Sequence, residues 1–506
     1  YAVQYAAEYG NLRVVELLLA DSRVDPSADD NYAIRQAAQH GKSQVVELLL
    51  ADSRVNPSAD GNYAIRNAAY CGHLRVVELL LSDSRVDPSA HDHHAIRYAA
   101  YCGHLRVVEL LLSDSRVDPS ADDNFAIRYA AQHGHLFVVG MLLADSRVDP
   151  SAVHNYAVRY AAKYGQVQVV ELLLSDSRVD PSADDNYAIR PIRKACAEGY
   201  TGIVELLLKD ARVDPSDVSN DAIKQASERG YQKIVAMLLA DSRVDPSVND
   251  NYAFQYAAKK GYVEVVELLI ADSRVNPSAG DNCAMKFAAH YGHVRVIELL
   301  LADSRVDPTA DSRIDPSVDN KRTIICAARY GHVEIIEILL KNPRVDPAVN
   351  DNCAIRHAAE NGHVRAVEVL IADSRVDPSA DDNQAILFAA RNGHLPVVEL
   401  LMADSRVDPS ANDNYAVRCA AHYGHVRVIK LLLADSRVDP SDGNNYAIRY
   451  AAQQGHPRVV ELLIADARVD PSADNNQAIR YAAQYGHLQI VKLLLADSRV
   501  DPSAND

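Results

Sequence analysis

Tryptophan is absent from the 506 residues, and phenylalanine (5) and methionine (4) are scarce. Long hydrophobic runs are also missing, because no apolar stretch approaches the roughly 18 residues that a membrane-spanning helix needs. Basic residues are too few to balance the acidic ones: 52 Lys and Arg stand against 69 Asp and Glu, for a net charge of −17. This deficit argues against binding to nucleic acid or to an anionic membrane, since both need clustered cations.

The seven cysteines form neither a disulfide framework nor a metal-binding pattern. Their number is odd and no CxxC motif occurs. Cys71 and Cys102 occupy the same place in neighbouring copies of a repeated segment. Equivalent atoms of stacked helices lie about 8–10 Å apart, whereas a disulfide needs Cα atoms within about 7 Å. We therefore expect free thiols in a reducing intracellular compartment, the cytoplasm.

The chain does contain one segment repeated sixteen times with a period of 31 residues. Two copies, Tyr70–Ala90 and Tyr101–Ala121, share the sequence YCGHLRVVELLLSDSRVDPSA. A fixed period of this length is typical of a solenoid, in which each repeat contacts only its neighbours and builds an extended surface. The first six copies place their prolines 31 residues apart, at Pro26, Pro57, Pro88, Pro119, Pro150 and Pro181.

Within one copy, residues 31–58, the pattern predicts a helix, a turn, a second helix and a loop. Asn31 is a favourable N-cap for a short first helix, in which Ala37 and Ala38 share one face. Gly41 is expected to end this helix in the left-handed conformation. The second helix has a wide apolar arc, so we expect it to be buried on several sides. Because the alanine-rich first helices are thinner, the stack should curve with them on its concave side.

The pattern predicts a single continuous array over residues 1–506. Two irregularities interrupt the register: residues 186–193 add three residues, and residues 303–318 repeat the loop and add eight. Insertions of this kind are tolerated at surfaces. The chain opens inside a helix pattern and stops inside a loop, without the polar capping repeats that solenoids need, so we expect it to be an excerpt of a longer array.

The copies resemble the ankyrin repeat, whose motif in one-letter code is TPLHxAAxxGHxxVVxLLL. Residues 98–112 match this motif in register through Tyr98-Ala99-Ala100, Gly103-His104, Val107-Val108 and Leu110-Leu111-Leu112. Residues 94–97 read HAIR where the family has TPLH. The resemblance covers the whole chain and implies an all-α, curved solenoid of about sixteen helix-turn-helix repeats. Family repeats have about 33 residues, so these shorter copies should carry short loops in place of the family's long β-hairpin fingers.

Positions that differ among the copies indicate where a partner would bind. The resemblance places the variable pair before each glycine at the partner-contacting surface, and the position three residues before that pair lies on the same outward stripe. The 26 tyrosines favour a contact surface, because tyrosine buries area at modest entropic cost and keeps a polar tip. We predict a partner-binding patch where outward aromatic residues are densest, flanked by acidic loop tips: Tyr98, Tyr101, Tyr129, Tyr160, Tyr164, Asp122 and Asp123.

Two plainer interpretations of the same residues stay open. The tyrosines at the earlier position could serve packing between repeats. The acidic tips could reflect only the preference of Asp and Asn for turns and helix caps; if they are functional, they form a rim that steers basic partners.

Histidine and arginine recur once per copy without a signature of catalysis. His73, His104 and His135 are too far apart to share a metal, and we expect them at the surface where the second helix starts. The dense cluster His91–His94 lacks a defined ligand spacing, and no GxGxxG or P-loop occurs. A further prediction is that arginines pair across repeats with the next acidic position, in the series Arg23, Arg54, Arg85 and Arg116 with Asp25, Asn56, Asp87 and Asp118.

Two functional hypotheses remain. The first is a non-enzymatic protein–protein interaction scaffold that binds partner proteins on the concave face. The alternative is a structural or assembly spacer without a specific ligand. The loops are uniform and the helix pairs are diverse, which favours the scaffold. We expect no enzymatic activity, cofactor, metal or small-molecule substrate.

Overall fold

The computed structural model describes residues 1–181, 189–306 and 323–503. These residues form thirty-two α-helices and no strand, which confirms the prediction of an all-α array of helix pairs. The described turns between pairs are short, as the short repeat predicted. The chain divides into two compact units, Tyr1–Val248 and Asn249–Asp506. No helix in the described part of the chain combines the length and apolar character needed to cross a membrane.

Odd-numbered helices are the first helices of the repeats, and even-numbered helices are the second. The first helices are α1 Ala2–Tyr9, α3 Ala28–Gln39, α5 Ala59–Tyr70, α7 Ala90–Cys102, α9 Ala121–Gln132, α11 Ala152–Lys163, α13 Ile189–Glu198, α15 Asp217–Arg229, α17 Val248–Lys260, α19 Ala279–Tyr291, α21 Thr323–Tyr330, α23 Val349–Glu360, α25 Ala380–Asn392, α27 Ala411–His422, α29 Asp442–Gln454 and α31 Ala473–Gln484. The second helices are α2 Leu12–Ala20, α4 Ser43–Leu50, α6 Leu74–Leu81, α8 Leu105–Leu112, α10 Leu136–Ala144, α12 Val167–Leu174, α14 Thr201–Lys209, α16 Gln232–Ala240, α18 Val263–Ala271, α20 Val294–Ala302, α22 Val333–Lys341, α24 Val364–Ala372, α26 Leu395–Met402, α28 Val426–Leu433, α30 Pro457–Ala465 and α32 Leu488–Leu495.

The two irregular segments are only partly described. Residues 186–188 and 307–318 lie outside the described residues. Residues 189–193 form the beginning of α13, which packs against α11 and α15. Residues 303–306 form the turn that follows α20.

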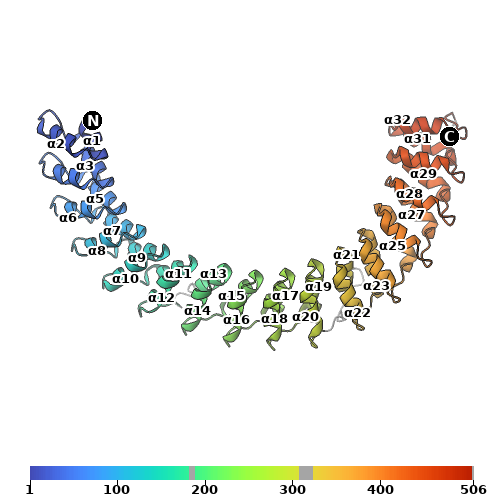
Figure 1. Ribbon diagram of the computed structural model, residues 1–506, viewed down its shortest axis with the longest axis horizontal. Helices are drawn as coiled ribbons and strands as arrows, with labels where there is room; N and C mark the ends of the chain where they lie inside the picture. The colour runs from blue at the N-terminus through green and yellow to red at the C-terminus, as the bar shows by residue number, and fades with distance from the viewer. Residues whose placement is uncertain (182–188, 307–322, 504–506) are drawn as a thin grey trace. The chain divides into compact units, whose positions relative to one another are not determined.

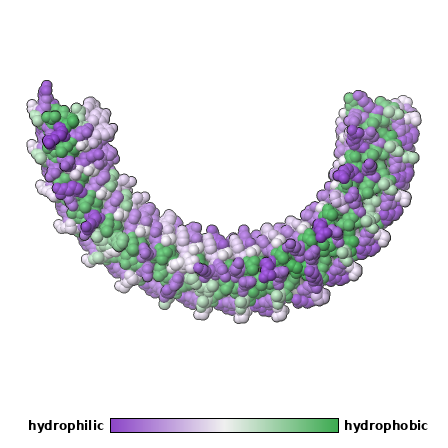
Figure 2. Space-filling model, viewed as in Figure 1, coloured by the Kyte–Doolittle hydropathy of each residue, from purple (hydrophilic) through white to green (hydrophobic). Residues whose placement is uncertain are grey.

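The helices of the first unit stack in a curved row. Figure 1 shows α1, α3, α5 and α7 on the inner side of this curve and α2, α6 and α8 on the outer side, as the difference in helix bulk predicted. Figure 2 shows that the inner side of the same unit is largely hydrophilic.

The second helices supply the larger core side chains. In α8, Val107, Val108 and Leu111 are fully or almost fully buried, whereas Glu109 is exposed. Leu110 and Leu112 are half-buried. The apolar arc therefore packs on more than one side, but the burial is concentrated in the Val-Val pair and one leucine.

A left-handed turn precedes the regular part of most first helices. In α3 this turn consists of Asp29, Asp30 and Asn31, with φ of 54°, 53° and 59°. Asp and Asn tolerate this region better than other non-glycine residues. The N-cap prediction for Asn31 is wrong: its Oδ1 accepts the backbone N–H of Asn56 in the next repeat at 2.7 Å. The side chain thus links two repeats instead of capping its own helix.

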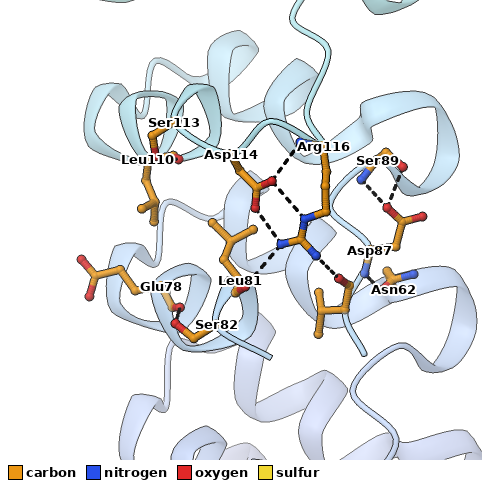
Figure 3. Close-up of polar contacts among 11 residues, drawn as sticks. Asn62, Glu78, Leu81, Ser82, Asp87, Ser89, Leu110, Ser113, Asp114 and Arg116 are labelled. Atoms are coloured by element: carbon orange, nitrogen blue, oxygen red, sulfur yellow. Dashed lines mark hydrogen bonds and ion pairs between the residues drawn. The ribbon is translucent and has the colours of Figure 1, made fainter. Parts of the chain in front are cut away.

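The arginine ladder also links repeats, but through different partners from those predicted. Arg116 forms a bidentate ion pair with Asp114 of its own loop: Nε lies 3.0 Å from Oδ1, and Nη2 lies 2.6 Å from Oδ2. The same guanidinium donates to the carbonyls of Val86 and Leu81 in the preceding repeat (Figure 3). The acidic residues of the predicted series accept other hydrogen bonds: Asp87 from Ser89, and Asp118 from Ser120. The prediction was wrong because the guanidinium reaches backbone oxygens, which no sequence pattern distinguishes.

A histidine ladder forms the third link. His104 Nε2 lies 3.0 Å from the carbonyl oxygen of Tyr70 in the preceding repeat, and because a carbonyl only accepts, Nε2 carries the proton. Gly72, which ends α5 with φ of 77°, makes room for this ring, since a Cβ there would lie 2.6 Å from His104 Nδ1. The left-handed glycine was predicted; its contact with the histidine was not.

Candidate protein-interaction surface

A regular first helix such as α7 presents five side chains on the side opposite its alanines, and we call these positions and their equivalents the face positions. The residues between them are buried alanines and branched apolar residues that pack against neighbouring helices. All five face positions of α7 are half-buried, which leaves part of each side chain open to solvent. These are His94, Arg97, Tyr98, Tyr101 and Cys102.

The predicted tyrosines lie along one side of α7, α9 and α11. Tyr101 is central, with its ring centroid 6.0 Å from that of Tyr98 and 6.0 Å from that of Tyr129. Tyr160 lies 6.3 Å from Tyr164. Tyr164 is exposed, and the other four are half-buried. The structure therefore brings three of the five into contact in one group and two in another.

Three residues that the sequence analysis did not select join these groups. His94 stacks on Tyr98 with centroids 4.1 Å apart. Phe125 stacks on Tyr129 at 4.1 Å, and Tyr156 stacks on Tyr160 at 3.8 Å. Each pair has the spacing i, i+4 on one helix face. That spacing is the sequence signal that could have identified them.

These added rings also bridge successive repeats. Phe125 lies 5.5 Å from Tyr98, and Tyr156 lies 5.6 Å from Tyr129. The result is one connected row of rings over three first helices, which we call the aromatic ladder. It consists of His94, Tyr98, Tyr101, Phe125, Tyr129, Tyr156, Tyr160 and Tyr164.

Cations lie against the ladder. The guanidinium carbon of Arg97 is 4.7 Å from the centroid of Phe125, and that of Arg128 is 5.2 Å from the centroid of Tyr156. Lys163 Nζ is 5.0 Å from the centroid of Tyr160. Such distances give favourable cation–π contacts.

The predicted acidic residues hold these arginines in place. Asp122 Oδ2 lies 2.5 Å from Arg97 Nη2, so this carboxylate already has a partner in the preceding repeat. Arg128 donates to the carbonyl oxygens of Asp123 and Asp122, at 2.8 and 2.9 Å. The carboxylate of Asp123 is exposed.

Burial shifts the pKa of two ladder residues. Burial lowers the pKa of His94 to about 4, and Arg66 and Arg97 add to the effect. Burial also raises the pKa of Tyr156, helped by its hydrogen bond with Tyr129. Both rings are therefore neutral at pH 7, and a neutral phenol or imidazole held in a stack serves packing and contact.

The histidine cluster does not assemble a metal site in the structure. His93 Nδ1 accepts the backbone N–H of Asp118 at 2.9 Å, in the role that asparagine has in other repeats. His94 faces Tyr98, and His91 is exposed. Among the described residues, no group of three or more His, Cys, Asp and Glu side chains could hold a metal ion.

The comparison with family models identifies the class of protein. Models described as ankyrin repeats (3 copies) match residues 3–92, 158–250, 223–312, 254–351, 309–382, 324–413, 357–442 and 415–506. The models ankyrin repeats (many copies) and ankyrin repeat match residues 127–174 and 91–124. The chain belongs to the ankyrin-repeat family, whose repeats are generally protein–protein interaction modules. Compared with curated proteins, the chain shows no significant match.

Proposed function

We propose that this chain is a non-enzymatic scaffold that binds one or more partner proteins on the face formed by its first helices. The observation that carries the proposal is the aromatic ladder over α7, α9 and α11. Its rings are partly exposed and are already ordered by stacking. Ordered aromatic side chains lose little conformational entropy on binding, and aromatic residues dominate the energy of many interfaces.

Within this face, Tyr98, Tyr101, Tyr129, Tyr160 and Tyr164 are the proposed contact residues. Tyr101 and Tyr164 are the best probes, because neither makes the close i, i+4 stack that supports the other rings. Asp122 and Asp123 belong to the same site as residues that position Arg97 and Arg128.

The test is a comparison of partner capture between the unmodified chain and Tyr101→Ala with Tyr164→Ala. Proteins captured by the first would be identified by mass spectrometry and then titrated against both. We expect affinity for a true partner to fall at least tenfold, or about 1.4 kcal/mol. The control is Tyr423→Ala with Tyr485→Ala, which removes two tyrosines of the other unit whose exposure matches that of Tyr164. Equal affinity for both double variants would place the site elsewhere.

The alternative is a structural spacer. It is favoured by the three hydrogen-bond ladders, which recur between repeats whatever the face residues are. A spacer would capture no protein in a manner that depends on the tyrosines. For either function we propose a reducing, cytoplasmic location, supported by the free thiols of Cys71 and Cys102.

A further inference from the structure

The face over α5, α7, α9 and α11 has a charge opposite to that of the whole chain. From the end of each left-handed turn to the closing glycine, residues 63–71, 94–102, 125–133 and 156–164 contain no Asp or Glu. They contain five basic residues, in a chain of net charge −17: Arg66, Arg97, Arg128, Arg159 and Lys163. The acidic residues are therefore placed in the loops and on the second helices, and the aromatic ladder lies in a basic strip.

The arginines in and next to this strip are of two kinds: some pair with a carboxylate of the following repeat, and others do not. Arg35, one repeat before the strip, and Arg97 pair with Asp60 and Asp122, each the first residue of the left-handed turn in the following repeat. These pairs measure 2.9 and 2.5 Å. An aspartate at this turn position thus neutralises the arginine of the repeat before it.

Arg66 and Arg128 lack such a carboxylate. The turn position that faces them holds His91 and Val153 instead of aspartate. The guanidinium of Arg66 donates only to the carbonyls of residues 60 and 61, both at 2.9 Å, and that of Arg128 only to those of residues 122 and 123. Both groups keep a full positive charge beside the ladder, with hydrogen-bonding capacity to spare.

Val153 also has an unusual backbone conformation. Its φ is 53°, in a left-handed region that β-branched residues rarely adopt. Its side chain is 41% exposed. Strained backbone that persists without a packing reason is a pointer to function. An aspartate at this position would both relieve the strain in the turn and neutralise Arg128, but the chain has valine there.

We propose that the strip binds an acidic, extended segment of a partner protein, with carboxylates at Arg66 and Arg128 and apolar or aromatic side chains on the ladder. This inference rests on the proposed function and names the chemistry of its partner. First helices of adjacent repeats lie about 8–10 Å apart, so the two arginines are roughly 16–20 Å apart. An extended chain advances about 3.3 Å per residue, which sets the two carboxylates about five or six residues apart.

The best-matched competitor for the strip is single-stranded RNA, because aromatic rings and arginines also bind bases and phosphates. The acidic loops at the N-terminal ends of the first helices favour the peptide. The exposed carboxylate of Asp123 lies beside the strip. It would repel a phosphate backbone that runs beyond the strip more than it would repel a short segment with two carboxylates.

The probe is a fluorescent twelve-residue peptide with two glutamates six positions apart and leucine or tyrosine between them. Fluorescence anisotropy would compare it with versions that carry Gln or Lys in place of Glu, and with a single-stranded RNA of the same length. We expect the Glu peptide to bind at least tenfold more tightly than the other three. Equal binding of the Gln peptide, or tighter binding of the RNA, would overturn the proposal.

The decisive variants are Val153→Asp and Val153→Asn. Both relax the turn, but only aspartate supplies the carboxylate that would neutralise Arg128. We expect Val153→Asp to weaken binding of the Glu peptide at least fivefold and Val153→Asn to leave it within twofold. Equal effects of the two substitutions would overturn the proposal.

The two proposals can fail separately. If a captured partner depends on Tyr101 and Tyr164 but binds the Val153→Asp and Val153→Asn chains equally, the scaffold function stands and the acidic-partner inference is wrong. If the partner is indifferent to the tyrosines as well, both are wrong for this face.

Discussion

The repeats of α7 to α11 and those of α23 and α25 share one framework and present different faces. His135 Nε2 lies 2.9 Å from the carbonyl of Tyr101, and His394 Nε2 lies 2.9 Å from that of Glu360. The asparagine link is equally alike, at 2.7 Å in the first region and 2.8 Å in the second.

The face positions of the second region are mostly polar. His357 takes the place of Tyr98, and its Nδ1 lies 3.0 Å from Glu360 Oε2. Arg356 pairs with Asp381 at 2.5 Å, so its charge is neutralised, unlike that of Arg128. The comparison teaches that hydrogen bonds to the backbone hold the repeats together, which leaves the face free to change its chemistry.

The largest effect should come from the shared core. Leu111→Ala in α8 and Leu370→Ala in α24 remove fully buried leucines at equivalent positions. Each should lower the free energy of unfolding by about 2–5 kcal/mol. Chemical denaturation would measure this loss. Glu109→Ala is the control and should stay within about 0.5 kcal/mol; a similar loss for Glu109→Ala and Leu111→Ala would refute the helix register.

A smaller loss of stability should follow when a side chain is added at the glycine that the histidine ring contacts. Gly72→Ala forces a left-handed alanine, at a cost of about 1–2 kcal/mol, and also displaces His104. Gly486→Ala meets the same backbone penalty, with no atom within 4 Å of the new Cβ. Thermal unfolding should therefore show a greater loss for Gly72→Ala. Identical losses would mean that the histidine link contributes nothing.

The left-handed turns should give effects of opposite sign in the two regions. Val153→Asn in α11 should raise the free energy of unfolding by about 1 kcal/mol, because asparagine tolerates φ of 53° better than valine. Asn350→Val at the equivalent position of α23, where φ is 52°, should lower it by a similar amount. Denaturation of both variants measures the pair, and a shift of the same sign in both would contradict this account of the strain.

A further effect is a pH dependence at His94, which only the first region should show because the equivalent residues of α23 and α25 are Cys353 and Gln384. The pKa of His94 is lowered to about 4 in the folded chain, from an ordinary 6.5, by burial and by the nearby Arg66, Arg97 and His91. Between pH 6.5 and pH 4, His94 is protonated in the unfolded chain and neutral in the folded chain. The free energy of unfolding therefore falls as the pH drops from 6.5 towards 4.

His94→Tyr is the matched control, because tyrosine occupies the same position in α5 and does not titrate in this range. Hydrogen exchange of the α7 amides at pH 7 and pH 5 would measure the difference. The protection of α7 should fall more in the unmodified chain than in the variant. An equal fall in both would show that His94 is not the source.

Much of the fold could be predicted from the sequence, because its signals are local and repeated. The helix pairs, the left-handed glycine and the buried leucine follow from periodicity within 31 residues. The partners of Asn31 and Arg116 could not, since each side chain bonds a backbone group of a neighbouring repeat. Backbone groups are the same in every residue, so no pattern indicates them.

Only part of the candidate site could be predicted, because some of its contacts form between repeats. Tyr98 and Tyr101 follow from a helical wheel, but Phe125 and Tyr156 connect the rings only once repeats are stacked. The basic strip was not predicted, because the net charge of −17 is a sum over the whole chain and does not show that one surface is basic.

The central claim is that the face of α7 to α11 carries recognition independently of the framework. Its most direct test gives α9 the face residues of α25, through Phe125→Gln, Arg128→Leu, Tyr129→Phe, Gln132→Arg and His133→Asn. The variant would be compared with the unmodified chain for its free energy of unfolding and for its affinity towards a partner whose binding depends on Tyr101 and Tyr164. We predict a change of less than about 1 kcal/mol in stability and a loss of at least tenfold in affinity. Unchanged affinity in the folded variant would contradict the claim.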